Sequence, residues 1–183
     1  MKKVVVLFLS LFMIVGCGCQ NNMTAKQAVE SYLERYRTHD DAVIDALDDY
    51  IASEDDLSEE QKDTYKEVLK KQYKNLKYKV TNETYDGEEA IVTVTITVFD
   101  LYRVQKEANE YLDEHQEEFQ DEDGVYDKDM FLDYKLDKMK DYTEQVEYTI
   151  DFHVVKTEDM KWEVQDLSTS DLEKIHGIYQ YAS

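Results

Sequence analysis

Histidine is the side chain that most readily exchanges protons or binds a transition metal near neutral pH, and this sequence has four. None of them has the spacing of a zinc motif. His39 and His115 lie in polar stretches and are expected at the solvated surface. His153 belongs to an alternating segment in which it faces away from the apolar side chains, so it could contact a ligand. His176 precedes Gly177 near the end of a predicted helix, where a hydrogen bond to a neighbour or a contact with the helix C-terminus is expected.

A carboxylate and a hydrogen-bonding tyrosine inside an apolar pocket would be the minimum for an isomerase-type enzyme. Tyr148 and Asp151 are close in one predicted strand, but their positions place them on opposite faces. Asp100, at the end of another long predicted strand, is the alternative acid. The sequence has no Ser-His-Asp order, glycine-rich phosphate loop or paired-carboxylate spacing. We therefore expect a protein that is not an enzyme, with a small-molecule enzyme or carrier that uses an internal pocket as the alternative.

The acidic stretch FQDEDGVYDKD, residues 119–129, can be compared with a calcium-binding loop. An EF-hand loop requires acidic residues at its positions 1, 3 and 5 and glycine at position 6. With Asp121 as position 1, Gly124 falls at position 4, so the pattern does not match. The sequence therefore predicts a solvated acidic loop and no metal site. The alternative is weak binding of a divalent ion by Asp121, Asp123, Asp127 or Asp129.

The chain starts with Lys2 and Lys3, which are followed by an uncharged apolar run over residues 4–15. That length fits the apolar region of a secretory signal peptide, and it is shorter than the roughly 20 apolar residues that cross a bilayer. The run stops at Gly16, a small residue of the kind that a signal peptidase requires. The pattern predicts export from the cytoplasm.

Residues 14–17, IVGC, resemble the lipobox of bacterial lipoproteins. The resemblance implies cleavage between Gly16 and Cys17 and a diacylglyceryl group on Cys17. Two or more acyl chains would anchor the protein firmly, whereas one gives marginal binding. Cys19 is a poorer candidate, because Gly16 would then occupy the position that requires a branched aliphatic residue. An ordinary cleaved signal peptide and an uncleaved anchor are the alternatives.

Three parts of the chain follow from this pattern: a signal peptide at 1–16, a lipidated tether at 17–23, and one domain at 24–183. The full chain has 42 acidic and 21 basic residues and a net charge of −21. Nucleic acid is not expected as a partner, because phosphate contacts need Lys and Arg. For the same reason the domain itself is not expected to bind an anionic membrane surface. Cationic peptides and divalent ions fit the charge better.

Apolar residues at helical spacing predict three helices in the first part of the domain. Two of these helices begin with a capping-box pattern, Thr24 with Gln27 and Ser58 with Gln61. The three apolar stripes are Ala28, Val29, Tyr32, Leu33 and Tyr36; Val43, Ile44, Leu47, Tyr50 and Ile51; and Tyr65, Val68, Leu69, Tyr73 and Leu76.

The period then changes to two, which predicts two strand pairs separated by a helical insertion at about 103–142. Asp86-Gly87 predicts the turn of the first hairpin. The side chains expected to face the core are Tyr78, Val80, Val92, Val94, Ile96 and Val98 in the first pair, and Tyr148, Ile150, Phe152 and Val154 in the second, with Trp162 and Val164 on the return strand. Thr93, Thr95 and Thr97 indicate a wetter opposite face.

The insertion and the end of the chain carry three further helical patterns. The first helix of the insertion is expected to include Phe119 in its apolar stripe, and the second is expected to use Met130 or Phe131. Ser170 is expected to cap a last short helix.

Helices followed by long antiparallel strands that curl around them resemble the cone-shaped nuclear transport factor two-like (cystatin-like) superfamily. The segments that carry the resemblance are AVESYLERY, AIVTVTITVFDL, YTIDFHVVKTEDMKWEVQDL and LEKIHGIY. More narrowly, the chain resembles small lipoproteins of Gram-positive bacteria with a domain of unknown function. The implied fold is α+β, with N-terminal helices packed on a curved antiparallel sheet and a helical insertion between the two strand pairs. The architecture hosts enzymes, binding modules and structural domains, so it implies no activity.

We expect an extracytoplasmic lipoprotein that is held on the cell membrane through Cys17 and whose domain is a binding or scaffold module. The expected partner, besides the membrane that the lipid enters, is a protein, a peptide or a small apolar ligand. His153, Tyr148 and Trp162 are the side chains expected to contact it. No cofactor and no metal are expected.

Overall fold

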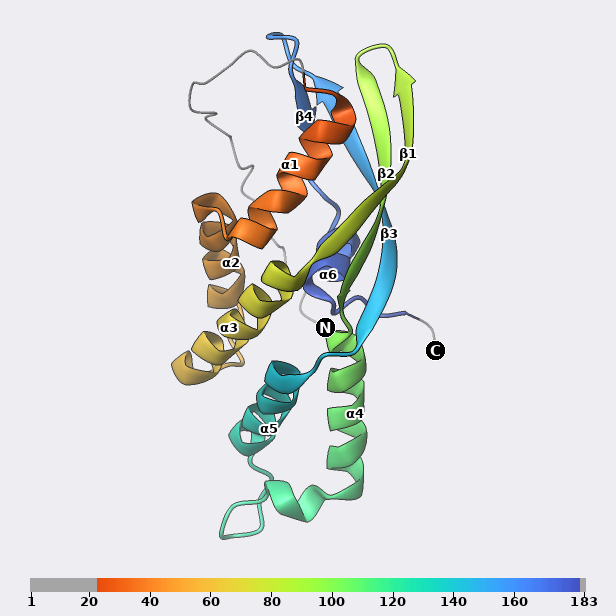
Figure 1. The fold of residues 1–183 in the computed structure, drawn as a ribbon. Coiled ribbons are helices and arrows are strands. Elements are labelled where there is room, and N and C mark those ends of the chain that lie inside the picture. Colours follow the sequence, from red (N-terminus) through yellow and green to blue (C-terminus); the bar gives the residue numbers. More distant parts are fainter. Residues whose placement is uncertain (1–22, 182–183) are drawn as a thin grey trace.

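The computed structural model describes residues 23–181, and within them the chain forms six α-helices, a short 3₁₀ helix and one four-stranded sheet (Figure 1). The elements in chain order are α1 (Ala25–Thr38), α2 (Asp41–Ala52), α3 (Glu59–Asn75), β1 (Lys77–Asp86), β2 (Glu89–Phe99), α4 (Leu101–Glu114), η1 (Gln116–Phe119), α5 (Lys128–Asp141), β3 (Gln145–Lys156), β4 (Trp162–Val164) and α6 (Thr169–His176). The sheet is antiparallel in the order β1-β2-β3-β4. The α+β fold with a helical insertion between the two strand pairs is confirmed.

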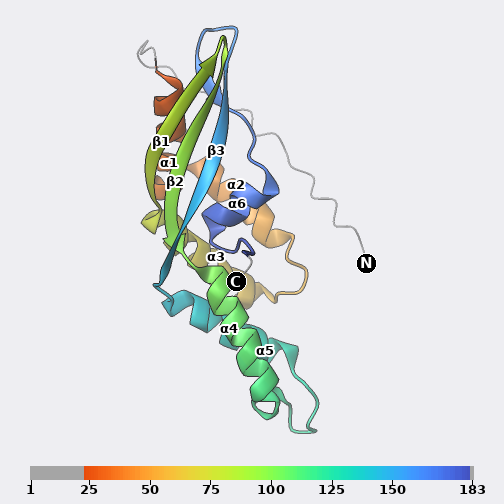
Figure 2. The same ribbon diagram turned by 90° about the vertical axis from the view of Figure 1, so that its right-hand side faces the viewer.

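One face of the sheet is the core of the domain, and α1, α3 and α6 pack on it (Figure 2). The alternation in β2 and β3 decides which side chains are buried, because successive residues of a strand point to opposite faces. Eight of the side chains that were expected to face inward are buried: Val92, Val94, Ile96, Val98, Tyr148, Ile150, Phe152 and Val154. The other four, Tyr78, Val80, Trp162 and Val164, are half-buried and pack against the core. Thr93, Thr95 and Thr97 lie on the other face and are half-buried. The expected division into a dry face and a wetter face is confirmed.

The helix starts follow the capping patterns of the sequence, with one correction. The capping boxes of Thr24 with Gln27 and of Ser58 with Gln61 are both present. The last helix, however, is capped by Ser168 and not by Ser170. The backbone of Ser168 is extended, and its Oγ accepts the N–H of Asp171 at 3.2 Å. A cap must precede the first helical turn, and Ser170 is already inside α6.

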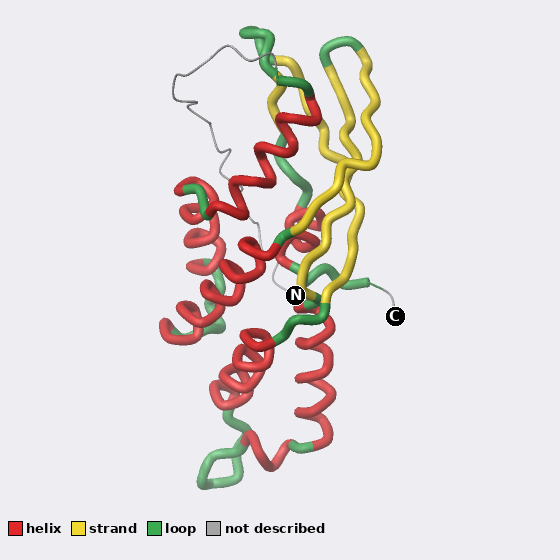
Figure 3. The backbone as a smooth tube through the Cα atoms, viewed as in Figure 1, coloured by secondary structure: helices red, strands yellow, loops and turns green. Residues whose placement is uncertain are grey.

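The insertion projects from one end of the sheet as an arm made of α4, η1 and α5, which Figure 3 shows as two helices joined by a loop. Its helices begin at Leu101 and end at Asp141, close to the expected bounds. Phe119 lies in η1 and not on α4, because α4 ends at Glu114. Of the two alternatives for α5, Phe131 is buried and Met130 is 43% exposed.

Gly177 allows the end of α6 to pack closely against α3 and the end of β2. Its φ is +75°, a conformation that favours glycine. A Cβ at this position would lie 2.2 Å from both Gln72 Nε2 and Phe99 O. Gln72 itself bridges the backbone of Phe99, since its Oε1 accepts the N–H at 2.9 Å and its Nε2 donates to the carbonyl at 3.0 Å. The end of α6 therefore sits against backbone, with no room for a side chain.

Candidate functional site

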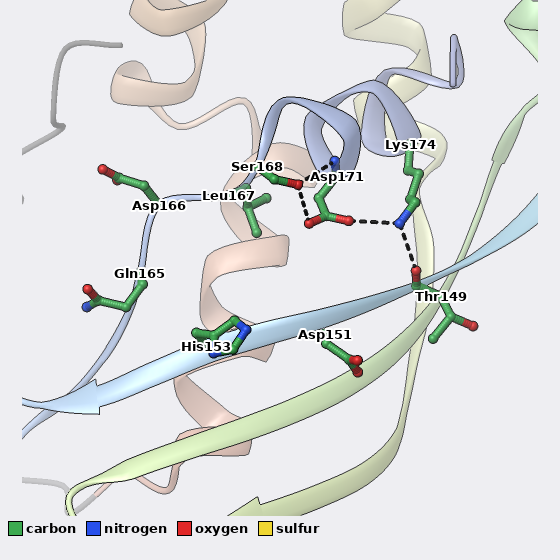
Figure 4. A pocket seen from close by; sticks show the side chains of 9 residues that line it. All are labelled: Thr149, Asp151, His153, Gln165, Asp166, Leu167, Ser168, Asp171 and Lys174. Atoms are coloured by element: carbon green, nitrogen blue, oxygen red, sulfur yellow. Dashed lines mark hydrogen bonds and ion pairs between the residues drawn. The ribbon is translucent and has the colours of Figure 1, made fainter. Parts of the chain in front are cut away.

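His153 lies in a groove of about 400 Å³ along the edge of β3 (Figure 4). The residues that line the groove come from β3, from the segment after β4 and from α6: Thr149, Asp151, His153, Gln165, Asp166, Leu167, Ser168, Asp171 and Lys174. His153 and Asp151 are exposed, as their strand parity predicts. We treat this groove as the candidate site.

The groove exists because β4 is much shorter than β3. The three residues of β4 pair with Val154–Lys156, and then the chain leaves the sheet. The last backbone contact on this edge is made by Gln165, whose N–H donates to the carbonyl of His153 at 2.8 Å. Further along the edge, Lys174 Nζ donates to the carbonyl of Thr149 at 3.2 Å. The segment that leads into α6 thus runs beside β3 without pairing to it.

Asp151 lies between these two contacts and faces the groove with its backbone. The N–H and C=O groups of alternate residues in an antiparallel strand point to the same side. Since the carbonyls of Thr149 and His153 point to the open edge, the peptide groups of Asp151 do so too. No hydrogen bond joins these two groups to another part of residues 23–181.

The groove carries an excess of negative charge. Asp171 is neutralised by Lys174, whose Nζ lies 2.8 Å from its Oδ1. Asp151 accepts a hydrogen bond from Thr93 Oγ1 at 2.7 Å, and Asp166 forms no ion pair with the described residues. Two carboxylates therefore face the solvent of the groove without a cationic partner, and a cationic ligand would be attracted there.

The hydroxyl of Ser168 is used to hold α6 in place. It accepts the N–H of Asp171, and it donates to Asp171 Oδ2 at 2.6 Å. Within residues 23–181 it makes no hydrogen bond with His153, so the hydroxyl–base contact that activates a nucleophile is lacking here. Ser168, Asp171 and Lys174 line the groove but were not predicted as site residues. The spacing Ser168-x-x-Asp171 is a capping signal that could have located the start of α6.

The three side chains expected to contact a ligand lie in three different places. His153 lines the groove and also a second hollow of about 270 Å³ beside the β1–β2 hairpin. Trp162 lies outside the groove, where its ring packs edge-on against Tyr85 with centroids 5.6 Å apart, and Lys156 Nζ lies 5.2 Å from its centre. Tyr148 points to the opposite, buried face of β3. A single ligand cannot contact all three.

Asp100, the alternative acid, lies between β2 and α4, and its charge acts on Tyr148 of β3. Asp100 is 6% exposed and caps α4, accepting the N–H of Arg103 at 3.0 Å. Its Oδ2 accepts the hydroxyl of Tyr181 at 2.6 Å. Burial, and next to it the charge of Asp100, raises the pKa of Tyr148 well above its usual value. Tyr181 lies after the last predicted helix, so no pattern in the sequence indicated its contact with Asp100.

The remaining histidines have structural contacts. His176 is buried and its Nε2 lies 2.8 Å from the hydroxyl of Tyr73, so the expected hydrogen bond to a neighbour is present. Burial lowers the pKa of His176 to about 4, which keeps the ring neutral at pH 7. His39 and His115 are only half exposed, in contrast to the expectation of fully solvated side chains. His39 contacts the carbonyl of Lys70 at 2.9 Å, and His115 stacks on Tyr111 with ring centroids 4.0 Å apart.

The acidic loop uses two of its carboxylates to hold its own backbone. Asp121 accepts the N–H groups of Asp123 and Val125, each at 2.9 Å. Asp127 caps α5 by accepting two further N–H groups. Across residues 23–181, no group of three or more His, Cys, Asp or Glu side chains is placed to hold a metal ion. In the same part of the chain, no helix combines the length and apolar character that a membrane crossing requires.

The sequence matches no protein-family model and no curated protein. A search of solved structures finds a similar chain from Bacillus subtilis, described as a "putative lipoprotein (ycdA)". The two chains share 17% sequence identity and a TM-score of 0.42. The match covers 77% of this chain and 46% of the other, so this chain spans less than half the length of that protein.

Proposed function

We propose that this chain is a bacterial lipoprotein, held through lipid on Cys17 at the extracytoplasmic face of the cell membrane, and that its domain binds a ligand without catalysing a reaction. The basic start, the apolar run and the lipobox of residues 14–17 support the anchor; these residues lie outside the described part of the chain. The helices on the core face of the sheet support a place among nuclear transport factor two-like domains. The excess of acidic residues would keep the domain off the anionic membrane surface.

The ligand in this proposal is an extended cationic peptide that pairs with the free edge of β3. The observation that carries it is the pair of unused peptide groups of Asp151, which face a groove between two carboxylates that lack a cationic partner. A peptide residue opposite Asp151 would exchange two backbone hydrogen bonds with it, as in strand addition. Lys or Arg side chains on either side would meet Asp151 and Asp166.

The two contacts that end the free edge limit the length of pairing. Gln165 covers the carbonyl of His153, and Lys174 covers that of Thr149. Along β3, the interval from Thr149 to His153 is about 13 Å at roughly 3.3 Å per residue. This length is enough for one hydrogen-bonded pair and its flanking residues. Charge would therefore contribute much of the affinity, and binding should weaken as salt is raised.

Titration of short Lys/Val peptides into the full chain in detergent, followed by fluorescence anisotropy, tests the groove. Asp166→Asn removes a charge that has no ion pair to lose, so the fold should persist while affinity falls about fivefold. Asp159→Asn makes the same charge change in the turn between β3 and β4 and is the matched control. Equal affinities for the two variants would place the peptide elsewhere.

The anchor is tested in the native host by detergent-phase partitioning and mass spectrometry of the mature N-terminus. Cys17→Ala should abolish partitioning into the detergent phase, because it removes the acylated thiol, while Cys19→Ala should leave partitioning unchanged. An unmodified thiol on Cys17 in the mature protein would refute the anchor without affecting the groove.

The second candidate function is a small-molecule enzyme or carrier that uses an internal pocket. The space between the sheet and the helices is packed with the buried side chains of the core, which weighs against a large pocket there. One observation still favours a small ligand: Asp100 and Tyr148 converge at the edge of that core. An internal pocket that binds an apolar molecule would protect core amides from hydrogen exchange, whereas a peptide in the groove would protect the edge of β3.

A further inference from the structure

Asp100 is a buried residue whose two carboxylate oxygens have different partners. One oxygen bonds to the backbone of α4, and the other bonds to the side chain of Tyr181. The position of Asp100 is fixed by its own N–H, which donates to the carbonyl of Glu144 at 2.9 Å. Oδ1 accepts the N–H of Arg103, which is the usual task of a helix cap. Oδ2 is not needed by the helix and accepts the hydroxyl of Tyr181 at 2.6 Å. A charged oxygen at 6% residue exposure thus depends on one tyrosine of the C-terminal segment.

Tyr148 supplies a second, independent sign of a binding site. Its side chain is more than nine-tenths buried, and its hydroxyl is the buried side-chain atom that lacks a hydrogen-bond partner within residues 23–181. Its ring packs against Tyr179, in the C-terminal segment that also carries Tyr181, and burial and then the charge of Asp100 raise the pKa of its hydroxyl. An unsatisfied buried hydroxyl destabilises the fold, and a ligand that bonds to it would recover that loss.

Aromatic rings surround these two polar groups. Tyr181 packs edge-on against Tyr102 with ring centroids 5.2 Å apart, and Tyr179 packs edge-on against Tyr148 at 5.7 Å. Ring faces attract organic cations, and a carboxylate among aromatic rings strengthens that preference. An anion would be repelled by Asp100, and a purely apolar molecule would leave both polar groups without partners.

The contact of Tyr181 is one that a ligand can replace. The chain turns at Gly177, whose carbonyl accepts the N–H of Tyr102 at 2.8 Å, and it then lies beside the start of α4 (Figure 2). Tyr181 is half exposed, and it reaches Asp100 from the solvent side. Loss of this contact would leave α6 and Gly177 in place, because their hydrogen bonds do not involve Tyr181.

We propose that Asp100, Tyr148 and the surrounding tyrosines form a binding site for a primary organic ammonium group, and that Tyr181 occupies this site in the absence of ligand. The ammonium donates one hydrogen bond to Asp100 Oδ2 in place of Tyr181 and a second to the hydroxyl of Tyr148. Its charge lies against the ring of Tyr102, because the ring of Tyr179 already has Lys174 Nζ over it at 5.3 Å. The site shares no residue with the lining of the groove, although Lys174 of the groove lies over the ring of Tyr179, and it does not depend on the peptide proposed there.

The probe is n-butylammonium, titrated by calorimetry into the detergent-solubilised full chain, with n-butanol as the neutral control of the same shape. Butylammonium should bind and butanol should not. Tyr181→Phe frees Asp100 while keeping the ring, so it should tighten binding about tenfold or more. Asp100→Asn keeps a residue that caps α4 but removes the charge, so it should abolish binding while circular dichroism remains unchanged.

The variant Tyr148→Phe tests whether the hydroxyl of Tyr148 binds a ligand or has only a structural role. It should weaken butylammonium binding and, without ligand, raise Tm by roughly 2–4 °C, because it deletes the unsatisfied hydroxyl. Tyr78→Phe is the matched control, since its hydroxyl donates to the carbonyl of Glu30 at 3.3 Å and its loss should not raise Tm. The proposal fails if Tyr181→Phe does not bind butylammonium, if butanol binds equally, or if Tyr148→Phe lowers Tm as the control does.

Discussion

The body of the domain and the arm are held together in different ways. The body buries one large cluster of side chains from α1, α2, α3, α6 and the sheet, in which Leu33, Leu69 and Phe152 are fully buried. The ends of α4 and α5 nearest the sheet add Leu101, Val104, Leu136 and Met139 to this cluster. The arm has a separate cluster of three buried residues, Ala108, Phe119 and Phe131, with half-buried tyrosines around it. A cluster of that size cannot offset the chain entropy of an arm of about 40 residues.

The arm therefore depends on the body for its stability. Helix α5 packs on α3, where Gln61 Nε2 donates to Asp133 Oδ1 at 2.9 Å and Lys71 Nζ donates to the carbonyl of Lys140 at 2.6 Å. Such a region is expected to open locally before the whole domain unfolds. The difference indicates that the body can carry a site that needs fixed geometry, and that the arm is the part of the domain suited to move.

The largest expected effect comes from removing a core side chain of the body. Phe152→Ala should lower the free energy of unfolding by roughly 3–5 kcal/mol, because the ring is fully buried on the core face of β3. Phe131→Ala makes the same change in the arm and should cost about 1–2 kcal/mol globally, because a locally open arm has already lost this contact. Urea denaturation measures the loss of global stability in both variants. Hydrogen exchange in α4 and α5 measures the loss of local stability in the arm. Equal global losses would mean that arm and body unfold as one unit.

The next effect is a pH dependence that belongs to the body. The pKa of His176 is about 4 in the folded chain and about 6.5 in the unfolded chain. As the pH falls below 6.5, the unfolded chain binds a proton that the folded chain excludes, so stability present above pH 6.5 is lost down to about pH 4. The loss should approach about 1.4 kcal/mol per pH unit within that window.

His176→Gln is the matched variant for this measurement. Glutamine can still donate to Tyr73 but does not titrate, so the difference in unfolding free energy between the two proteins isolates the histidine. The remaining neighbours of the ring, Tyr50 on α2 and Tyr73 on α3, stay neutral throughout the window. Parallel pH profiles for the two proteins would show that the imidazole is not kept neutral by burial.

The sequence predicts those parts of this molecule that local periodicity controls. The alternation of Val92, Val94 and Ile96 identifies the core face of β2 before any contact is known, and the capping boxes locate two helix starts. Those patterns are local because each residue's environment follows from its place in a strand or helix. The cap of α6 was misplaced by two residues, since several hydroxyl residues compete for that position.

The two sites could not be predicted in the same way. The groove depends on β4 ending after three residues and on the path of the segment that follows, neither of which has a periodic signal. The contact between Tyr181 and Asp100 joins residues 81 positions apart. Such contacts are set by how the elements pack together, and strand parity could add only that Tyr148 faces the core and His153 does not.

The smallest expected effect concerns an exposed ion pair between the arm and the body. Lys128 Nζ at the start of α5 lies 2.5 Å from Asp56 Oδ1, but the two side chains are 50% and 82% exposed. Solvent and salt screen such a pair, so Lys128→Ala should leave the urea midpoint and the exchange protection of α5 unchanged. Gln61→Leu removes a buried amide from the same interface and should reduce the protection of α5. Loss of protection in Lys128→Ala would show that charge, and not the buried contacts with α3, holds the arm against the body.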